Sequence, residues 1–276
     1  GFTGIVLANA REAQPTTDSH VGSVIDDVQC EEWVNNNLES VQQAEPGDYV
    51  GLRFTGAGAA AAKFLSDFSA TCKSHSSEEA CKLYSSEMQY FVSQVEGICK
   101  AAAARQIRVL IDAESSTYQR AIDCAALRAL VLNTYQMYLN SSADKLKSHL
   151  NHSMKNGYIL GIKMVRGAYL HTELDKQSLH VSKQQTDEAY DDTVRFLLRE
   201  GSGAAWKADV MLATHNAKSV RQALDLYTSI YMTSKEDYRL RPQVCGVAFA
   251  QLMGMADEVS MELVNKIEQA KEQEST

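Results

Sequence analysis

Short runs of strand-forming residues alternate with longer stretches of helical periodicity along almost the whole chain. Several of these runs are nearly continuous in apolar residues, such as Val109-Leu-Ile, and strands that are covered on both faces need this composition. Strands that alternate with helices predict parallel βα units. The predicted strands are Gly4–Ala10, Tyr49–Phe54, Arg108–Ala113, Leu130–Gln136, Tyr158–Val165, Asp209–Thr214 and Val244–Ala250.

Helix candidates with apolar residues three and four positions apart lie between the predicted strands. They are Ser76–Arg105, Thr117–Ala129, Ser142–Lys155, Gln184–Arg199, Asn216–Ser229 and Ala256–Lys271. The segment 56–107 is too long for one crossover helix, so we expect two helices there, one of them an addition to the repeat. We treat residues 1–276 as one domain.

The number of repeats favours a (βα)₈ TIM-type barrel in which seven of the eight strands are present. Such a barrel typically needs about 250 residues, and this chain has 276. An open doubly wound sheet usually has a glycine-rich phosphate turn after its first strand, and Asn9-Ala-Arg-Glu-Ala is no such turn. The predicted class is therefore an α/β barrel, incomplete by one strand.

Charge and cysteine usage narrow the function. A net charge of −8 argues against nucleic acid as a partner, because nucleic acid requires a basic face. No window of about 18 apolar residues exists that could span a bilayer. The cysteines contain no CxxC pair, which argues against a zinc site. They are Cys30, Cys72, Cys81, Cys99, Cys124 and Cys245.

Polar residues follow six of the predicted strands, where a parallel barrel carries its catalytic groups. They are Glu12; Arg53 and Thr55; Asp112 and Glu114; Asn133 and Gln136; Lys163, Arg166 and Tyr169; and Thr214, His215 and Asn216. For any one of them a structural role is an equal alternative. Asp112 or Glu114 could cap the next helix, His215 could bond to backbone, and Arg53 could pair with Glu12. The joint pattern favours a site.

Three chemistries remain open from these residues. Asp112, Glu114 and His215 could bind a metal, although the neighbouring cations oppose a divalent ion. Lys163 could form a Schiff base, as in barrel aldolases. The cations and amides together suit an anionic cofactor with a pyrophosphate, because charge-assisted hydrogen bonds are the strongest.

The motifs resemble those of the proline dehydrogenase family, in the same order and over essentially the whole chain. The eight residues Lys163-Met-Val-Arg-Gly-Ala-Tyr-Leu resemble its fifth-strand signature. Gly51-Leu-Arg-Phe-Thr-Gly-Ala-Gly is most similar to its monofunctional, eukaryotic, fungal-like branch. The further matches are Phe2-Thr-Gly-Ile-Val-Leu, Leu110-Ile-Asp-Ala-Glu, Asn133-Thr-Tyr-Gln, Ala213-Thr-His-Asn and Gln251-Leu-Met-Gly-Met.

The resemblance implies a flavoprotein oxidoreductase that holds FAD non-covalently. It would oxidise L-proline to Δ1-pyrroline-5-carboxylate in proline catabolism, by hydride transfer to flavin N5, and pass the electrons to quinone. The implied location is the matrix side of the mitochondrial inner membrane, with peripheral membrane association. An alternative is an inactive barrel that acts as a binding or regulatory pseudoenzyme.

The resemblance also implies residue roles. The catalytic group would be Asp112, Tyr169, Leu252 and the ion pair of Glu12 with Arg53, and Arg166 is expected to point away from the site. The family usually has lysine where Arg53 stands, and the bulkier, forked arginine changes the shape of the pocket there. The residues that would bind flavin are Asn133, Lys163, Val165, Gly167, Thr214, His215 and Asn216.

The family continues into an eighth strand and a Tyr-x-x-Arg-Arg-x-x-Glu-Asn helix whose arginines bind the proline carboxylate. The residues from Lys266 to Thr276 do not match this pattern. A stop after Thr276 in the gene would favour the pseudoenzyme, and a downstream arginine helix would exclude it.

We expect this chain alone to oxidise proline weakly or not at all, because a bound carboxylate without its arginine partners loses several kcal/mol of binding. We also expect poor stability, because the first and last strands expose their edges. Reduction of dichlorophenolindophenol by an FAD-loaded sample with proline measures the activity, and ordinary rates would contradict the expectation.

Overall fold

The chain divides into two compact units in a computed structural model. The N-terminal unit comprises Gly4–Thr134 with Ala168–Leu179, and the C-terminal unit comprises Tyr135–Gly167 and His180–Thr276 with Gly1–Thr3. The structure describes residues 2–13, 22–72, 75, 79, 85–129, 131–173, 175–200, 207–236 and 244–274. We describe each unit by itself.

The strands of the sheet follow one another in sequence order, β1 to β7. Within the N-terminal unit, β1 pairs in parallel with β2 and β2 with β3, and within the C-terminal unit β5 pairs in parallel with β6 and β6 with β7. The parallel pairing confirms the predicted α/β class. The strands are β1 Val6–Ala8, β2 Tyr49–Leu52, β3 Arg108–Ile111, β4 Leu132–Gln136, β5 Ile159–Val165, β6 Lys207–Ala213 and β7 Val244–Ala250.

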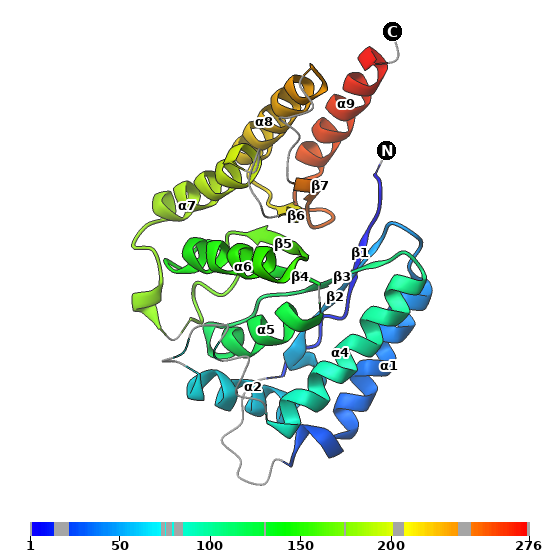
Figure 1. The fold of residues 1–276 in the computed structure, drawn as a ribbon, viewed down its shortest axis with the longest axis vertical. Coiled ribbons are helices and arrows are strands. Elements are labelled where there is room, and N and C mark those ends of the chain that lie inside the picture. The colour runs from blue at the N-terminus through cyan, green and yellow to red at the C-terminus, as the bar shows by residue number, and fades with distance from the viewer. Residues whose placement is uncertain are drawn as a thin grey trace. The chain divides into compact units, whose positions relative to one another are not determined.

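The described α-helices of the N-terminal unit are α1 Val28–Gln43, α2 Ala59–Thr71, α4 Ser86–Ala104 and α5 Ser116–Ala129. Helices α1 and α4 lie side by side (Figure 1). Their caps explain where they begin, since the side chain of Asp27 accepts a hydrogen bond from Gln29 N and that of Ser85 from Met88 N. Between them, the rings of Trp33 and Phe91 stack with centroids 5.6 Å apart.

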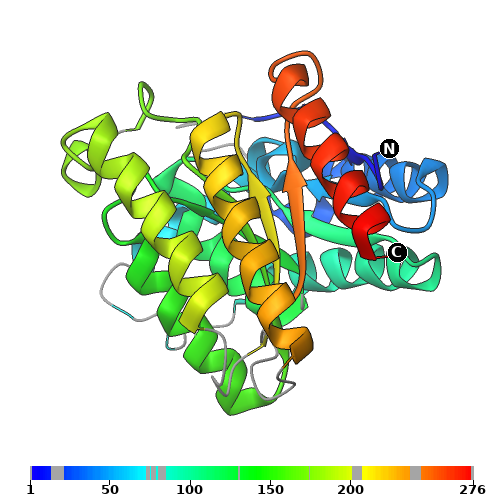
Figure 2. The ribbon, with the colours of Figure 1, turned by 90° about the horizontal axis from the view of Figure 1, so that it is seen from above.

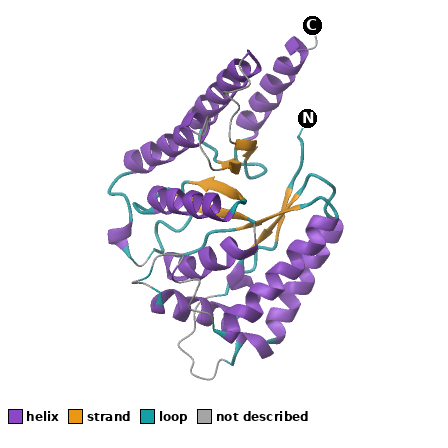
Figure 3. Ribbon diagram, viewed as in Figure 1, coloured by secondary structure: helices purple, strands orange, loops and turns teal. Residues whose placement is uncertain are grey.

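The described helices of the C-terminal unit are α6 Ser142–Asn156, α7 Lys183–Arg195, α8 Ala217–Glu236 and α9 Asp257–Glu274 (Figure 3). Helix α6 ends at Gly157, whose left-handed φ of 70° suits glycine. Helix α7 continues into a π-helical turn, Phe196–Glu200, and packs against α8 (Figure 2). No described helix is both long and apolar enough to cross a membrane.

The sequence predicted every strand, with differences only near the ends. It did not include α1 among the predicted helices. For the helix predicted at Ser76–Arg105, α4 covers Ser86–Ala104, and most of the residues before position 85 lie outside the described part of the chain. The described part of the segment 56–107 therefore contains two helices, α2 and α4.

The aromatic cluster of Trp33, Phe54 and Phe91 predicts a large packing effect, since all three rings are buried and in mutual contact. Replacing Phe91 by alanine should lower the free energy of unfolding by about 3–5 kcal/mol, because it leaves a cavity. Urea denaturation measures the change. Lys100→Ala, on the exposed face of the same helix, is the control. Equal effects of the two substitutions would contradict this packing.

Candidate active and cofactor-binding site

Four of the five predicted catalytic residues form one hydrogen-bonded cluster in the N-terminal unit. Arg53 follows β2, and its Nη1 lies 2.7 Å from Glu12 Oε1, beyond β1. Its Nε lies 3.4 Å from Asp112 Oδ2, directly after β3. Tyr169 donates its hydroxyl to the same Glu12 oxygen at 2.8 Å. The parallel strands carry these residues to one end of the sheet, as the sequence predicted for this set.

The cluster combines one cation with two carboxylates. Burial opposes the charge on Arg53, but Asp112 and Glu12 outweigh it and raise the pKa of the guanidinium. Burial and the bond to Glu12 raise the pKa of Tyr169 well above its usual range, so the phenol keeps its proton at neutral pH. The side chains of Arg53 and Asp112 remain 31% and 16% exposed, so the cluster is open to a small polar molecule.

Glu114 holds the chain that follows β2. Its Oε1 accepts the backbone N–H groups of Phe54 at 2.9 Å and Thr55 at 3.1 Å, and its Oε2 accepts the hydroxyl of Thr55. At the start of helix α5, Glu173 accepts the backbone N–H and hydroxyl of Ser116.

Asn133 on β4 is bonded to the buried interior of the same unit. Its Nδ2 donates to Asp123 Oδ1 at 2.9 Å, and its Oδ1 accepts the N–H of Thr134 at 3.0 Å. Asp123 also accepts from Gln119. Asn133, which is predicted to bind the cofactor, therefore has one further amide N–H to donate.

The fifth-strand motif lies in the C-terminal unit. Lys163 is half-buried on β5, beside Met211 of β6. The carbonyl of Val165 accepts the N–H of Met137 at 2.9 Å. Gly167 has a φ of 130°, and an added Cβ would lie 1.8 Å from Cδ1 of Tyr138. Only glycine fits there, and this explains the glycine of the motif.

The turn after β6, residues 214–216, presents hydrogen-bond donors. Oγ1 of Thr214 accepts Arg166 Nη1 at 2.7 Å and the N–H of Asn216 at 3.2 Å. Nε2 of His215 accepts the N–H of Leu252 at 3.0 Å, so the ring proton sits on Nδ1. Asn216 Oδ1 accepts the N–H of Ser219, at the start of α8. The hydroxyl, ring and amide hydrogens therefore remain to be donated.

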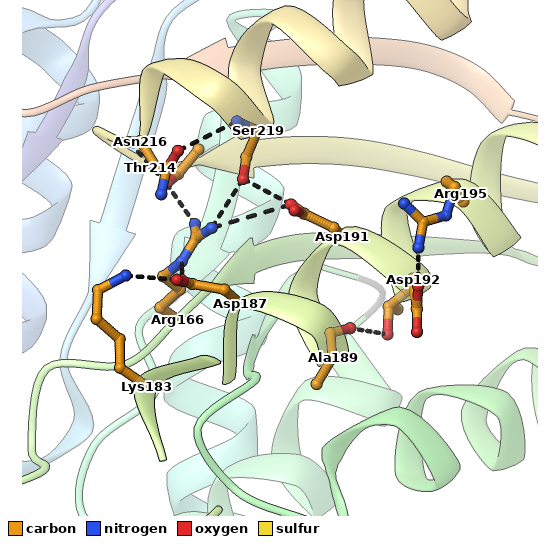
Figure 4. A network of polar contacts seen from close by, with 11 residues as sticks. Arg166, Lys183, Asp187, Ala189, Asp191, Asp192, Arg195, Thr214, Asn216 and Ser219 are labelled. Carbon is orange, nitrogen blue, oxygen red and sulfur yellow. Dashed lines mark hydrogen bonds and ion pairs between the residues drawn. The ribbon is translucent and has the colours of Figure 1, made fainter. Parts of the chain in front are cut away.

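Arg166 contacts this turn, and acidic residues of α7 surround it (Figure 4). Its Nε lies 2.6 Å from Asp187 Oδ1, its Nη2 lies 2.8 Å from Ser219 Oγ, and Asp191 lies 3.9 Å away. Asp187, Asp191 and Ser219 were not among the residues predicted from the sequence. The available signal was the spacing of Lys183, Asp187 and Asp191, which places these side chains on one face of α7.

The metal alternative receives no support from the arrangement. No group of three His, Cys, Asp or Glu residues within the described ranges is placed to hold a metal ion. Nε2 of His215 accepts a backbone N–H, and Glu114 accepts three donors around β2.

Leu252 is 63% exposed and contacts His215 through its backbone, so two predicted site residues meet at the ends of β6 and β7.

Comparison with known proteins agrees with the motifs. The family model described as proline dehydrogenase matches residues 8–273. A Dictyostelium discoideum protein named proline dehydrogenase 1, mitochondrial, is 31% identical over 198 residues, which are 65% of this chain and 33% of that protein. A Rattus norvegicus protein named hydroxyproline dehydrogenase is 31% identical over 196 residues, 64% of this chain and 41% of that protein. The chain thus spans less than half the length of these relatives.

Solved structures of proline utilization A (PutA) have the same fold. The protein from Bradyrhizobium japonicum matches with a TM-score of 0.69 at 14% identity, over 96% of this chain and 25% of that one. The protein from Bdellovibrio bacteriovorus matches with a TM-score of 0.67 at 14% identity, over 96% of this chain and 27% of that one. These matches confirm the predicted barrel-type α/β fold.

The environment of Glu114 predicts a pH-dependent stability. Burial outweighs the accepted hydrogen bonds and raises the pKa of this carboxyl above the usual value of a glutamate. A folded-state pKa above the unfolded one stabilises the protein below the unfolded pKa, and this contribution is lost as the pH rises through the folded pKa. Thermal unfolding of the wild type should therefore lose stability with rising pH relative to Glu114→Gln.

A second substitution separates the charge of Glu114 from its hydrogen bonds. Glu114→Leu leaves the N–H groups of Phe54 and Thr55 unsatisfied, so it should cost about 1–3 kcal/mol at every pH. Parallel pH profiles for the wild type and Glu114→Gln would contradict the raised pKa.

Proposed function

Because the chain belongs to the proline dehydrogenase family, we propose that it forms the flavin-binding barrel of an enzyme of proline catabolism. The enzyme oxidises L-proline to Δ1-pyrroline-5-carboxylate and uses FAD. The observation that carries the proposal is the cluster of Glu12, Arg53, Asp112 and Tyr169, which joins the ends of three neighbouring strands.

The cluster suits a zwitterionic amino acid. With two carboxylates and one guanidinium it carries an excess of one negative charge, which favours the ring ammonium of proline. Glu12 and Asp112 bind that ammonium, and Arg53 keeps the two carboxylates apart and oriented. The protonated hydroxyl of Tyr169 donates to the same Glu12 oxygen as Arg53 and so helps to orient that carboxylate. The motif position of Leu252 in the family is the basis for including it as an apolar wall of the proline pocket.

The donors of the C-terminal unit fit FAD, whose pyrophosphate and ring carbonyls are hydrogen-bond acceptors. Thr214, His215 and Asn216 retain donors, and they precede the N-terminus of α8, where backbone N–H groups favour phosphate. The ammonium of Lys163 stabilises negative charge on a reduced ring. When bound, FAD would supply a hydride acceptor, its N5, for the carbon next to the ring nitrogen of proline.

Further contacts of this cofactor come from the remaining motif positions. Val165 and Gly167 offer backbone beside the ring, and the absence of a side chain at Gly167 allows a close approach. Asn133 contributes its second amide N–H. These roles rest on the motif positions of the family.

The cellular setting follows from the same family membership. Quinone is the proposed electron acceptor, and the proposed location is the matrix side of the mitochondrial inner membrane, with peripheral association. The relatives from Dictyostelium discoideum, Arabidopsis thaliana and Homo sapiens are named mitochondrial, and this supports the compartment.

The direct test measures FAD binding and flavin reduction on the protein with all residues that its gene encodes. FAD should remain bound through gel filtration and should bleach anaerobically on addition of L-proline, with pyrroline-5-carboxylate as product. L-Alanine, which lacks the ring, is the control and should not bleach it. Bound FAD that no concentration of proline reduces would favour the pseudoenzyme. A protein that binds no FAD would overturn the proposal.

Replacement of Arg53 tests the cluster. Arg53→Met removes the group that keeps Glu12 and Asp112 apart and oriented, so the two carboxylates no longer converge on the ring ammonium. The proline concentration that half-saturates bleaching should rise about tenfold or more, whereas the dissociation constant of FAD should change little. Arg53→Lys keeps the charge and should stay within a few-fold of the wild type. Lys63→Met, which removes a comparable surface pair with Asp67, is the control. Unchanged half-saturation in Arg53→Met would contradict the assigned role.

A further inference from the structure

Arg166 is the most heavily engaged polar side chain around the turn of residues 214–216. It follows β5, and its guanidinium reaches three other elements: α7 through Asp187, the turn through Thr214, and α8 through Ser219 (Figure 4). Its side chain is only 19% exposed. The guanidinium carbon lies 4.3 Å from the centroid of the Tyr190 ring, which fixes the plane of the group.

These contacts engage three of the N–H groups of Arg166, one on each nitrogen of the guanidinium. A guanidinium has five N–H donors. Nε serves Asp187, Nη1 serves Thr214, and Nη2 serves Ser219 with Asp191 at 3.9 Å. Ser219 is itself fixed, because its hydroxyl donates to Asp191 at 2.6 Å. Each nitrogen of the Arg166 guanidinium is therefore already bonded to a group of the protein.

The bond from Arg166 determines what Thr214 can do. A threonine hydroxyl has two acceptor lone pairs and one donor hydrogen. Arg166 Nη1 and the N–H of Asn216 occupy both lone pairs. The hydroxyl hydrogen then has to be donated, and the described residues offer it no acceptor. Without Arg166, one lone pair would be released and Thr214 could turn its hydroxyl either way.

The backbone of the turn is held as well, by residues at the end of β7. Thr214 N donates to Ala250 O at 3.1 Å, and Gln251 Nε2 donates to Thr214 O at 3.3 Å. These bonds fix the backbone of Thr214 against β7, and Arg166 fixes its side chain against α7 and α8. The second and third donors of the turn, His215 and Asn216, follow directly in sequence.

We propose that Arg166 is a positioning residue that fixes the turn of residues 214–216 as a set of hydrogen-bond donors for the acceptor-rich part of FAD, without contacting the cofactor. This inference rests on the proposed flavin function and adds a residue to it. According to this inference, the network of Asp187, Arg166, Ser219 and Asp191 increases the affinity for FAD.

The test is the dissociation constant of FAD, measured by fluorescence on protein freed of cofactor. Arg166→Lys keeps the charge but offers a single point in place of the planar fork, so it cannot serve α7, Thr214 and Ser219 together. Residues that orient metal ligands change metal affinity by about 10- to 100-fold when they are replaced, and we expect the dissociation constant of FAD to rise by a similar factor. The visible circular dichroism of bound FAD should change too.

Arg221→Lys is the matched control. Arg221 on α8 also makes a forked ion pair, with both oxygens of Glu262 on α9, and among the described residues it has no hydrogen bond to the turn. Its replacement should leave FAD affinity unchanged. Thermal unfolding of both cofactor-free variants shows whether lost affinity merely follows lost stability.

Thr214→Val distinguishes action of Arg166 through Thr214 from a general structural role of Arg166. It removes the hydroxyl and keeps the shape, so FAD affinity should fall. If Arg166 acts through Thr214, the double variant should lose clearly less than the product of the two single effects. Should Arg166→Lys fail to fold, Ser219→Ala loosens Arg166 without touching the turn and should weaken FAD binding a few-fold.

The outcomes separate the two proposals. Wild-type protein that binds no FAD overturns the proposed function and this inference with it. Wild-type binding with unchanged affinity in Arg166→Lys overturns the inference alone. Independent effects of Arg166→Lys and Thr214→Val also overturn it, because the guanidinium would then not act through the hydroxyl. A weaker, non-additive Arg166→Lys with an unaffected Arg221→Lys supports it.

Discussion

Parallel pairing of the strands is the constraint on which the site depends. In each unit, parallel strands place their carboxyl ends on one edge of the sheet, so the residues that follow successive strands become neighbours. Glu12, Arg53 and Asp112 are more than forty residues apart in sequence, and yet one guanidinium bonds both carboxylates. The turn of residues 214–216 and Leu252 meet for the same reason, at the ends of β6 and β7.

Polar groups near the strand ends are stabilised mainly by other polar groups of the chain. Glu114 is buried, and it satisfies backbone N–H groups that would otherwise be unpaired beyond β2. Arg166 is held by Asp187 of α7. Burial opposes the charge of Asp187, but Lys183 and Arg166 outweigh it and lower the pKa of that carboxyl. A site built in this way is largely formed before any ligand binds, since each donor and acceptor already has a direction.

The sequence predicted the fold well because strand and helix patterns are local. Helix α1 was missed because its buried face includes Asn37 as well as Cys30, Trp33 and Val41, so its apolar stripe is interrupted. The Arg53–Glu12 pair was predicted from the motif positions, and the structure confirms it. The role of Glu114 could not be predicted, because its partners, Phe54 and Thr55, lie about sixty residues away and bond through their backbones. The partners of Arg166 on α7 were missed for the same reason of distance.

Arginine at position 53 has a consequence that charge alone does not describe. Neighbouring parallel strands lie about 4.8 Å apart, and β2 lies between β1 and β3. The forked group of Arg53 uses Nη1 toward Glu12 and Nε toward Asp112, so one side chain bridges both neighbours at fixed angles. A lysine ammonium would place the same charge at one point on a flexible stem and could not bond both carboxylates at fixed angles. The remaining N–H groups of the guanidinium lie in the same plane as the bridge. The arginine therefore gives this family member a more rigid acidic pair than lysine would, at the cost of space in the pocket.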